Sequence, residues 1–229
     1  MGKRIVIAID GPAGSGKSTI ARRLAARLGC TYIDTGAMYR AVGLLALRGG
    51  VPLDDERKLE SLARAADMEF LDNGSRLRLN GEDVSEAIRT PEISDAASKV
   101  SALPAVRRIL VEKQREMGGR ASVVMEGRDI GTVVFPNADI KIFLDASPAV
   151  RTARRLKERA EKGDPVKPEQ VASEVEERDR RDRSRADSPL LQAPDAVYLD
   201  TSEMTLEQVE DWILKLIRDR TSNGKEAQP

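Results

Sequence analysis

Short runs of apolar residues alternate with longer amphipathic stretches along this chain, and the alternation predicts an α/β protein. The first apolar run, residues 5–9, is rich in β-branched side chains and is typical of a buried strand. Further strands are indicated at residues 31–33, 121–125, 141–144 and 195–200. Helical stretches are expected at residues 19–28, 41–47, 54–66, 93–100, 105–117, 148–161, 169–185 and 206–218.

The period of the pattern changes in one part of the chain, where it predicts an antiparallel hairpin. Residues 68–71 and 76–79 flank a turn sequence, and the second run alternates strictly between charged and apolar side chains. Asn80-Gly81 follows, which is a strong hairpin signal. A hairpin within an α/β chain indicates an insertion, and we place it in a small subdomain at about residues 37–105.

Residues 148–185 are strongly charged and predict two helices, separated by a break with two prolines at 163–168. The spacing of Glu174, Arg178, Asp182 and Arg185 places these four side chains on one face of the second helix. A solvated helix with salt bridges is the ordinary interpretation. A helical hairpin that covers phosphates is the alternative, because the segment is dense in guanidinium groups: Arg154, Arg155, Arg178, Arg181 and Arg185.

The composition limits the chemistry that the chain can perform. Its 229 residues include 38 Lys plus Arg and 38 Asp plus Glu, so no net charge attracts the protein to nucleic acid or membrane surfaces. One cysteine, Cys30, and the lack of histidine exclude an intramolecular disulfide, a zinc cluster and a His-based triad. Phosphate or proton chemistry must therefore use carboxylates, lysine, arginine and hydroxyl groups.

The sequence also predicts where the protein works. Lys3 and Arg4 precede only five apolar residues, which are too few for the apolar region of a signal peptide. No apolar run approaches a membrane span, so we expect a soluble, cytoplasmic protein. Residues 221–229 are polar and lack periodicity, and we expect a disordered tail there.

One stretch carries specific chemistry. Residues 11–18, Gly-Pro-Ala-Gly-Ser-Gly-Lys-Ser, match the phosphate-binding P-loop and lie between a predicted strand and a predicted helix. Its backbone N–H groups can surround a polyphosphate, Lys17 can reach the β and γ phosphates, and the Ser18 hydroxyl can ligate Mg²⁺. A glycine-rich turn that binds nothing is the plainer alternative.

A second group of basic residues is too large to serve one triphosphate alone. The segments 34–40 and 126–129 follow predicted strands, so both lie at the sheet edge that carries the P-loop. Arg40, Arg128 and three further arginines suit a second anionic substrate; the three are Arg107, Arg178 and Arg185. A nucleoside monophosphate would need no general base, because its phosphate, with a second pKa of about 6, is largely dianionic at neutral pH.

Several classes of P-loop protein are alternatives, and the sequence separates some of them. A guanine-specific GTPase would carry an N-K-x-D motif on a late strand, and none is present. A motor or transport ATPase would have a longer apolar strand before its acidic residue than the one before Glu126. Another monophosphate or small-metabolite kinase stays open, as does a regulatory protein that binds ATP without transferring phosphate. Zero net charge and few aromatic residues argue against a nucleic-acid-binding module.

Five segments together resemble the bacterial cytidylate kinase family: residues 11–18, 34–40, 126–135, 142–146 and 177–185. The likeness runs from the first strand to the last helix and includes the hairpin insert. It implies the P-loop nucleoside monophosphate (NMP) kinase fold, with helices on both faces of a parallel sheet, an NMP-binding insert with a small antiparallel sheet, and a short helical LID. The implied divisions are a core of residues 1–36, 106–150 and 186–220, the NMP-binding subdomain at 37–105 and the LID at 151–185.

The resemblance also implies a reaction, the transfer of the γ-phosphate of ATP to CMP or dCMP with Mg²⁺, by a monomer. The ATP-binding residues would be Gly11, Pro12, Ala13, Gly14, Ser15, Gly16, Lys17, Ser18 and Thr19, with Ser18 as the metal ligand. The substrate-binding residues would be Thr35, Arg40, Ser98, Arg107, Arg128, Asp129, Arg178, Asp182 and Arg185. The catalytic residues would be Lys17, Arg128, Arg181 and Arg185.

Within that set the resemblance implies individual roles. Ser98, Arg107 and Asp129 would read the cytosine, Arg40 and Arg128 would hold the CMP phosphate, and Arg178 and Asp182 would contact the sugar. Arg185, with Arg181 and the arginines near 154, would act on the transferred phosphate.

Three positions differ from the family's commoner residues. Thr35 stands where Ser is frequent, Glu126 where Asp is frequent, and Arg180 where Asp can occur. The longer side chain of Glu126 shifts its carboxylate by about one bond, so its role toward Mg²⁺ stays open.

Overall fold

The computed structural model describes residues 4–161, 163–164 and 166–223, and within them five strands form a parallel sheet. The strand order is β2-β6-β1-β7-β8. The strands are β1 (Val6–Asp10), β2 (Thr31–Asp34), β6 (Val123–Gly127), β7 (Ile140–Asp145) and β8 (Val197–Asp200). Because β1 is central, the P-loop that follows it opens at the middle of the sheet's carboxyl edge, where ligands bind in open α/β sheets.

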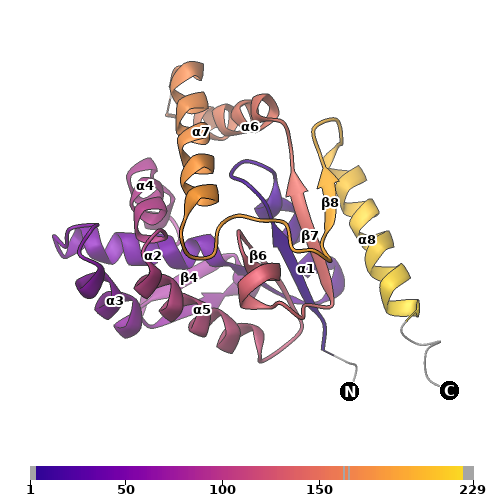
Figure 1. Ribbon diagram of the computed structural model, residues 1–229, viewed down its shortest axis with the longest axis horizontal. Helices are drawn as coiled ribbons and strands as arrows, with labels where there is room; N and C mark the ends of the chain where they lie inside the picture. The colour runs from indigo at the N-terminus through magenta and orange to yellow at the C-terminus, as the bar shows by residue number, and fades with distance from the viewer. Residues whose placement is uncertain (1–3, 162, 165, 224–229) are drawn as a thin grey trace.

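Helices cover both faces of this sheet, as predicted (Figure 1). Ile7 and Ile9 of β1 pack on the side of α1 (Lys17–Leu28) and α8 (Leu206–Asn223). Val6 and Ala8 pack on the other side, with α5 (Pro104–Gly118) and the short helix η3 (Ile130–Val134). All four side chains are buried, which explains why the strand is an uninterrupted apolar run.

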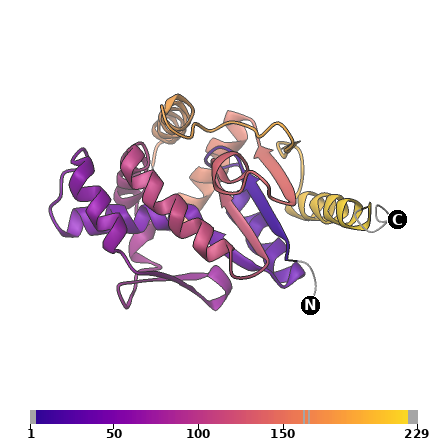
Figure 2. The same cartoon turned by 60° about the horizontal axis from the view of Figure 1, so that its bottom comes forward.

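The chain between β2 and α5 forms a layer on the left of Figures 1 and 2, and its apolar core also includes Val106, Ile109 and Leu110 of α5. Its helices are α2 (Thr35–Arg48), α3 (Glu56–Ala65) and α4 (Pro91–Val100), with short turns η1 (Asp72–Gly74) and η2 (Ala87–Arg89). Its antiparallel sheet contains β3 (Met68–Leu71), β4 (Arg76–Leu79) and β5 (Glu82–Asp83). The predicted hairpin is confirmed, and β5 adds a strand too short to show alternation in the sequence.

The charged segment forms the two predicted helices, α6 (Pro148–Glu161) and α7 (Pro168–Ser184), which pack against each other. Arg151 of α6 and Asp179 of α7 form a buried ion pair of 2.6 Å. Figure 1 shows α7 descending beside α4 of the insert, and Arg181 of α7 lies 3.4 Å from Asp95 of α4. The helical pair therefore extends from the end of β7 to the insert.

The position of β6 differs from the sequence prediction in a way that affects the site. The strand spans Val123–Gly127 rather than 121–125, because it pairs with β1 on one side and β2 on the other. Glu126 is consequently a buried strand residue opposite Ile9 and not a residue of the following loop.

Several helices are longer than predicted, among them α1 and α8. α1 begins at Lys17 rather than 19, so the end of the P-loop is the first turn of the helix. α8 continues past the expected start of the tail at 221, and Thr221 Oγ1 donates to Ile217 O at 2.8 Å. The remainder of that expected tail, residues 224–229, lies outside the described residues. In the described part of the chain no helix combines the length and the apolar character needed to cross a membrane.

Candidate active site

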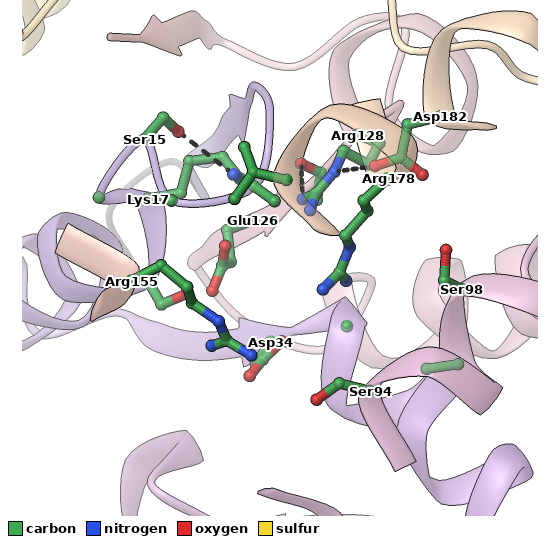
Figure 3. Close-up of a pocket in the computed structure, with 18 of the residues that line it drawn as sticks. Ser15, Lys17, Asp34, Ser94, Ser98, Glu126, Arg128, Arg155, Arg178 and Asp182 are labelled. Atoms are coloured by element: carbon green, nitrogen blue, oxygen red, sulfur yellow. Dashed lines mark hydrogen bonds and ion pairs between the residues drawn. The ribbon is translucent and has the colours of Figure 1, made fainter. Parts of the chain in front are cut away.

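A cleft of about 1000 Å³ opens at the carboxyl edge of the sheet, between the P-loop, the insert and the α6–α7 pair (Figure 3). Most residues predicted from the sequence line it: Ala13, Gly14, Ser15, Gly16, Lys17, Ser18, Thr19, Thr35, Arg40, Ser98, Arg107, Arg128, Asp129, Arg178, Arg181, Asp182 and Arg185. Gly11 and Pro12 lie outside this lining, at the start of the P-loop. The fold thus brings together side chains from distant parts of the chain.

The P-loop is held from behind by neighbouring elements. Gly11 has φ of +148°, and a Cβ there would lie 2.0 Å from Leu144 O, so only glycine fits. Arg151 of α6 donates to Ala13 O at 3.1 Å and to Ala146 O at 2.9 Å. Arg151 was not predicted from the sequence, because nothing local distinguishes it from the other arginines of its helix.

Lys17 is folded along the P-loop (Figure 3). Its Nζ donates to Pro12 O at 2.7 Å and to Ser15 Oγ at 3.3 Å. Burial, and then the charge of Arg128, lower the pKa of Lys17 to about 7. A polyphosphate in the cleft would supply the negative charge that stabilises this ammonium group.

Two arginines at the start of the charged segment have different surroundings. Arg154 Nη1 donates to Ser15 O at 3.1 Å and its Nη2 donates to Thr201 O at 2.9 Å, so Arg154 holds the P-loop backbone. Arg155 reaches into the cleft in Figure 3, while its Nη1 donates to Glu158 Oε2 at 2.8 Å. Arg155 is thus the better placed of the two to contact a phosphate.

Two carboxylates converge beside the end of the P-loop. Glu126 Oε1 accepts a hydrogen bond of 2.8 Å from Tyr32 Oη, and its carboxylate also interacts with the Ser18 hydroxyl. Burial, and then the charge of Asp34, raise the pKa of Glu126. This corner therefore holds hard oxygen ligands, and the surroundings of Glu126 disfavour its negative charge.

The start of α2 places Thr35 and Arg40 at the cleft. Asp34 caps the helix by accepting from Ala37 N at 2.9 Å, and it pairs with Arg40 Nη2 at 2.7 Å. Thr35 Oγ1 donates to Glu126 O at 2.7 Å, which leaves only its lone pairs for a substrate.

Ser98 of α4, Arg107 of α5 and Asp129, between β6 and η3, line the cleft, and we call them the Arg107 cluster. Arg107 is buried, donates to the Asp129 carboxylate and to Ser101 O, and lies 5.5 Å from the centre of the Tyr39 ring. Ser98 Oγ is buried and has no hydrogen-bond partner among the described residues. An unpartnered buried hydroxyl at the wall of a cleft indicates a contact reserved for a ligand.

Positive charge accumulates where α7 meets the end of β6. Arg128 Nε donates to Asp182 Oδ2 at 2.8 Å, and its Nη1 donates to Gly127 O at 3.2 Å (Figure 3). Burial, and then the charge of Arg128, lower the pKa of Arg178 to about 10. Burial opposes ionisation of Asp182, but Arg128 and Arg178 outweigh it and lower its pKa. An anion between the two guanidinium groups would relieve their repulsion.

Arg185 and Arg181 have different neighbours, although both line the cleft. Arg185 Nη1 lies 3.8 Å from Asp182 Oδ1, and its charge also interacts with that of Arg107. Arg181 Nη1 and Nη2 both lie 3.4 Å from Asp95 Oδ1 on the insert. Arg185 is therefore associated with the Arg107 cluster, and Arg181 bridges α7 and α4.

Comparison with known proteins identifies close relatives. A family model described as cytidylate kinase matches residues 7–219 of the chain. A protein of Solibacter usitatus named cytidylate kinase is 60% identical over 226 residues, covering 98% of this chain and 97% of that protein. The cytidylate kinase of Syntrophotalea carbinolica is 50% identical over 222 residues, covering 96% and 94% of the two chains.

Solved structures show a related fold at low sequence identity. A gluconokinase from Sinorhizobium meliloti 1021 has a TM-score of 0.51 at 16% identity, covering 99% of this chain and 100% of that chain. An uncharacterized protein from Eubacterium ventriosum has a TM-score of 0.54 at 14% identity, with coverages of 94% and 99%. At this identity the likeness concerns the fold alone, an α/β architecture shared with a P-loop kinase.

Proposed function

Because this chain belongs to the cytidylate kinase family, we propose that it transfers the γ-phosphate of ATP to CMP or dCMP and releases ADP with CDP or dCDP. The family resemblance seen in the sequence is thus confirmed by full-length relatives. One observation supports transfer to a cytosine nucleotide in particular. The same cleft contains the P-loop and the Arg107 cluster, whose hydrogen-bonding groups complement cytosine.

We assign the donor side of the cleft to ATP. Residues 11–19 would surround its phosphates with backbone N–H groups, and Lys17 would leave its contacts with the loop to reach the β and γ phosphates. Arg155 of α6 lies near the same space, which supports our proposal that the α6–α7 pair covers the phosphates of ATP. Such a cover would exclude water and suppress hydrolysis of ATP.

The oxygen atoms around Ser18 fit Mg²⁺. Among the described residues no three His, Cys, Asp or Glu side chains form a closed metal site. Mg²⁺ usually takes only one or two protein oxygens, however, and completes its shell with phosphates and water. We propose the Ser18 hydroxyl as its ligand, with the Glu126 carboxylate facing the same corner. When bound, the ion would neutralise charge on the transferring phosphates.

We assign the other side of the cleft to the acceptor nucleotide. Arg40 and Arg128 would hold the phosphate of CMP, and Arg178 and Asp182 would contact its sugar. Thr35, at the junction of β2 and α2, would contribute a further substrate contact. The accumulated positive charge around Arg128 and Arg178 supports an anionic group at this place.

Base recognition would depend on the Arg107 cluster. Cytosine carries an N4 amino donor beside the acceptors N3 and O2. The Asp129 carboxylate would accept from N4, while Arg107 and the unpartnered Ser98 hydroxyl would donate to N3 and O2. Uracil would place its O4 acceptor against the carboxylate of Asp129, so the site would discriminate against UMP.

Phosphoryl transfer then requires alignment and charge stabilisation rather than a general base. The phosphate of CMP is largely dianionic near neutral pH, with a second pKa of about 6, and can attack the γ-phosphorus directly. Lys17, Arg128, Arg181 and Arg185 would balance the charge that spreads over the transferring group. Arg181 would have to release Asp95 of α4 to do so.

The proposal includes the organisation of the chain. Residues 37–105 would act as the NMP-binding subdomain and residues 151–185 as the LID, on a core of residues 1–36, 106–150 and 186–220. We propose, as the family resemblance implies, that the protein is a monomer, and we place it in the cytoplasm. Light scattering should give the mass of one chain, and a dimer mass would overturn this part of the proposal.

A coupled ADP-release assay tests the proposed function. ATP and Mg²⁺ are supplied with CMP, dCMP, UMP, AMP or GMP in separate reactions, beside a control without acceptor. Turnover concentrated on CMP and dCMP is the expected result. Preference for another monophosphate would overturn the substrate assignment, and equal ADP release without an acceptor would indicate an ATPase.

A further inference from the structure

Asp10 is a buried carboxylate that the proposed reaction does not use. It is the last residue of β1 and directly precedes the P-loop, yet it lies outside the lining of the cleft. Burial raises the pKa of Asp10 to about 7, despite backbone hydrogen bonds that lower it. A carboxylate in such a costly position calls for a structural reason.

The partners of Asp10 are the first two N–H groups of η3. Asp10 Oδ1 accepts from Ile130 N at 2.8 Å, and Oδ2 accepts from Gly131 N at 2.7 Å. The first N–H groups of a helical turn have no acceptor within the turn itself and need one from elsewhere. Gly131 leaves room for this approach, since a Cβ there would lie 3.3 Å from Asp10 Oδ2. Asp10 therefore caps η3 from a distant part of the chain.

Capping by Asp10 has a consequence for Asp129, which occupies the N-cap position of η3. An aspartate at this position commonly caps its own helix with its side chain. Here the side chain of Asp129 makes no capping hydrogen bond and instead pairs with Arg107. An N-cap side chain usually accepts from the second or third N–H of its helix, and the second, that of Gly131, is already occupied by Asp10, as is that of Ile130 before it.

We propose that Asp10 is a positioning residue that sets the choice of acceptor base, because it takes over the capping of η3 and leaves Asp129 directed at the Arg107 cluster. This inference rests on the proposed function, in which Asp129 reads cytosine. Asp10 acts through Asp129 and does not touch the acceptor.

The first test is Asp10→Asn, measured as the ratio of kcat/KM for CMP to that for UMP. The asparagine oxygen can accept from one N–H of η3, but its amide group repels the other, which becomes available to Asp129. We expect the ratio to fall by about tenfold, the effect of losing one charge-assisted hydrogen bond. Because both reactions use the same ATP site, a disturbance of the adjacent P-loop cancels in the ratio.

Asp139→Asn is the matched control. Asp139 Oδ2 accepts from Val6 N at 2.9 Å, so it makes the same kind of contact at the opposite end of β1. This variant should keep the CMP-to-UMP ratio of the unaltered protein. A fall in the ratio as large as that of Asp10→Asn would show a general effect of disturbing β1 and would overturn the inference.

Gly131→Ala disturbs the same contact from the side of η3 and serves also if Asp10→Asn does not fold. It should lower the ratio as well, and an unchanged ratio in a folded Gly131→Ala protein would overturn the inference.

In an Asp129→Asn background, Asp10→Asn should cause no further fall in the CMP-to-UMP ratio, because its effect passes through Asp129. A further fall of about tenfold in that ratio would mean that Asp10 affects the choice of base without acting through Asp129, and would reject its proposed role. Absence of CMP turnover in the unaltered protein would instead reject the proposed function, and the inference with it.

Discussion

The proposed donor and acceptor sides of the cleft are built in different ways. The proposed donor side is one continuous stretch, residues 11–19, which would bind phosphate mainly through backbone N–H groups, and its geometry depends on glycines such as Gly11. The acceptor side collects side chains from α2, α4, α5, the β6–η3 junction and α7. Ion pairs such as Arg40–Asp34 and Arg128–Asp182 hold these side chains in place in the structure.

This difference teaches how the two halves of the reaction can be separated by experiment. A change in the continuous loop should slow transfer to every acceptor alike, since all acceptors share one donor. A change in the collected side chains should alter the preference among acceptors and leave ATP binding nearly intact.

Lys17→Ala should have the largest effect. Loss of the ammonium group removes charge stabilisation from the transferring phosphate, and kcat should fall about 10³-fold. The loss should be equal for CMP and UMP in steady-state assays on a variant whose melting temperature is unchanged. A loss of kcat with only one of the two acceptors would contradict the assignment of Lys17 to the donor side alone.

Asp129→Asn should have the next largest effect, and on selectivity. The asparagine amide can donate to O4 of uracil, so the CMP-to-UMP ratio of kcat/KM should fall by about 100-fold while KM for ATP is nearly constant. Asp129→Ala, which cannot donate, should lose CMP activity without gaining UMP activity. Equal CMP-to-UMP ratios in Asp129→Asn and the unaltered protein would show that Asp129 does not take part in base recognition.

Arg40→Ala should weaken capture of the acceptor phosphate. We expect KM for CMP to rise about 10- to 100-fold, as for the loss of a charged hydrogen-bond donor, with little change in KM for ATP. Arg48→Ala is the matched control on the same helix, because Arg48 pairs with exposed Glu82 away from the cleft. Equal rises in KM for both nucleotides would show that Arg40 serves the donor side too.

The smallest effect concerns the protonation of Lys17. Its pKa of about 7 in the free protein should rise when phosphates bind, so binding of a non-hydrolysable ATP analogue takes up a proton above pH 7. Affinity should therefore fall as pH rises, by about fivefold from pH 7 to pH 8. Calorimetry in buffers of different ionisation enthalpy measures this uptake, and Lys17→Met should abolish it. Uptake of the same size in Lys17→Met would assign the proton to another group.

The donor side could be predicted from the sequence because its partners are neighbours along the chain. The strand predicted at residues 5–9 and the helix predicted at residues 19–28 frame the motif, and the structure has β1 and α1 at these places. The location of Arg40 and Arg128 at the cleft was predicted by the same logic, since both follow strands of one sheet. Their individual roles came from the family resemblance and stay predictions.

Residues that act through distant partners could not be predicted. Asp10 contacts residues 120 and 121 positions away, and Arg151 contacts one 138 positions away. Tyr32, which donates to Glu126 across 94 positions, looks in the sequence like an ordinary strand aromatic. Short elements escape prediction for a related reason: β5 has two residues and η3 has five, too few for a period to appear.

The apolar core of the insert bears on how such an enzyme changes its acceptor in evolution. Helix α5 lies outside the insert, yet it contributes Val106, Ile109 and Leu110 to this core. The Arg107 cluster is divided in the same way, because Ser98 lies in the insert while Arg107 and Asp129 follow it in the chain. Exchange of the insert between related genes would therefore carry Ser98 to the recipient and leave Arg107 and Asp129 behind. A new acceptor would need matching changes on both sides of that boundary.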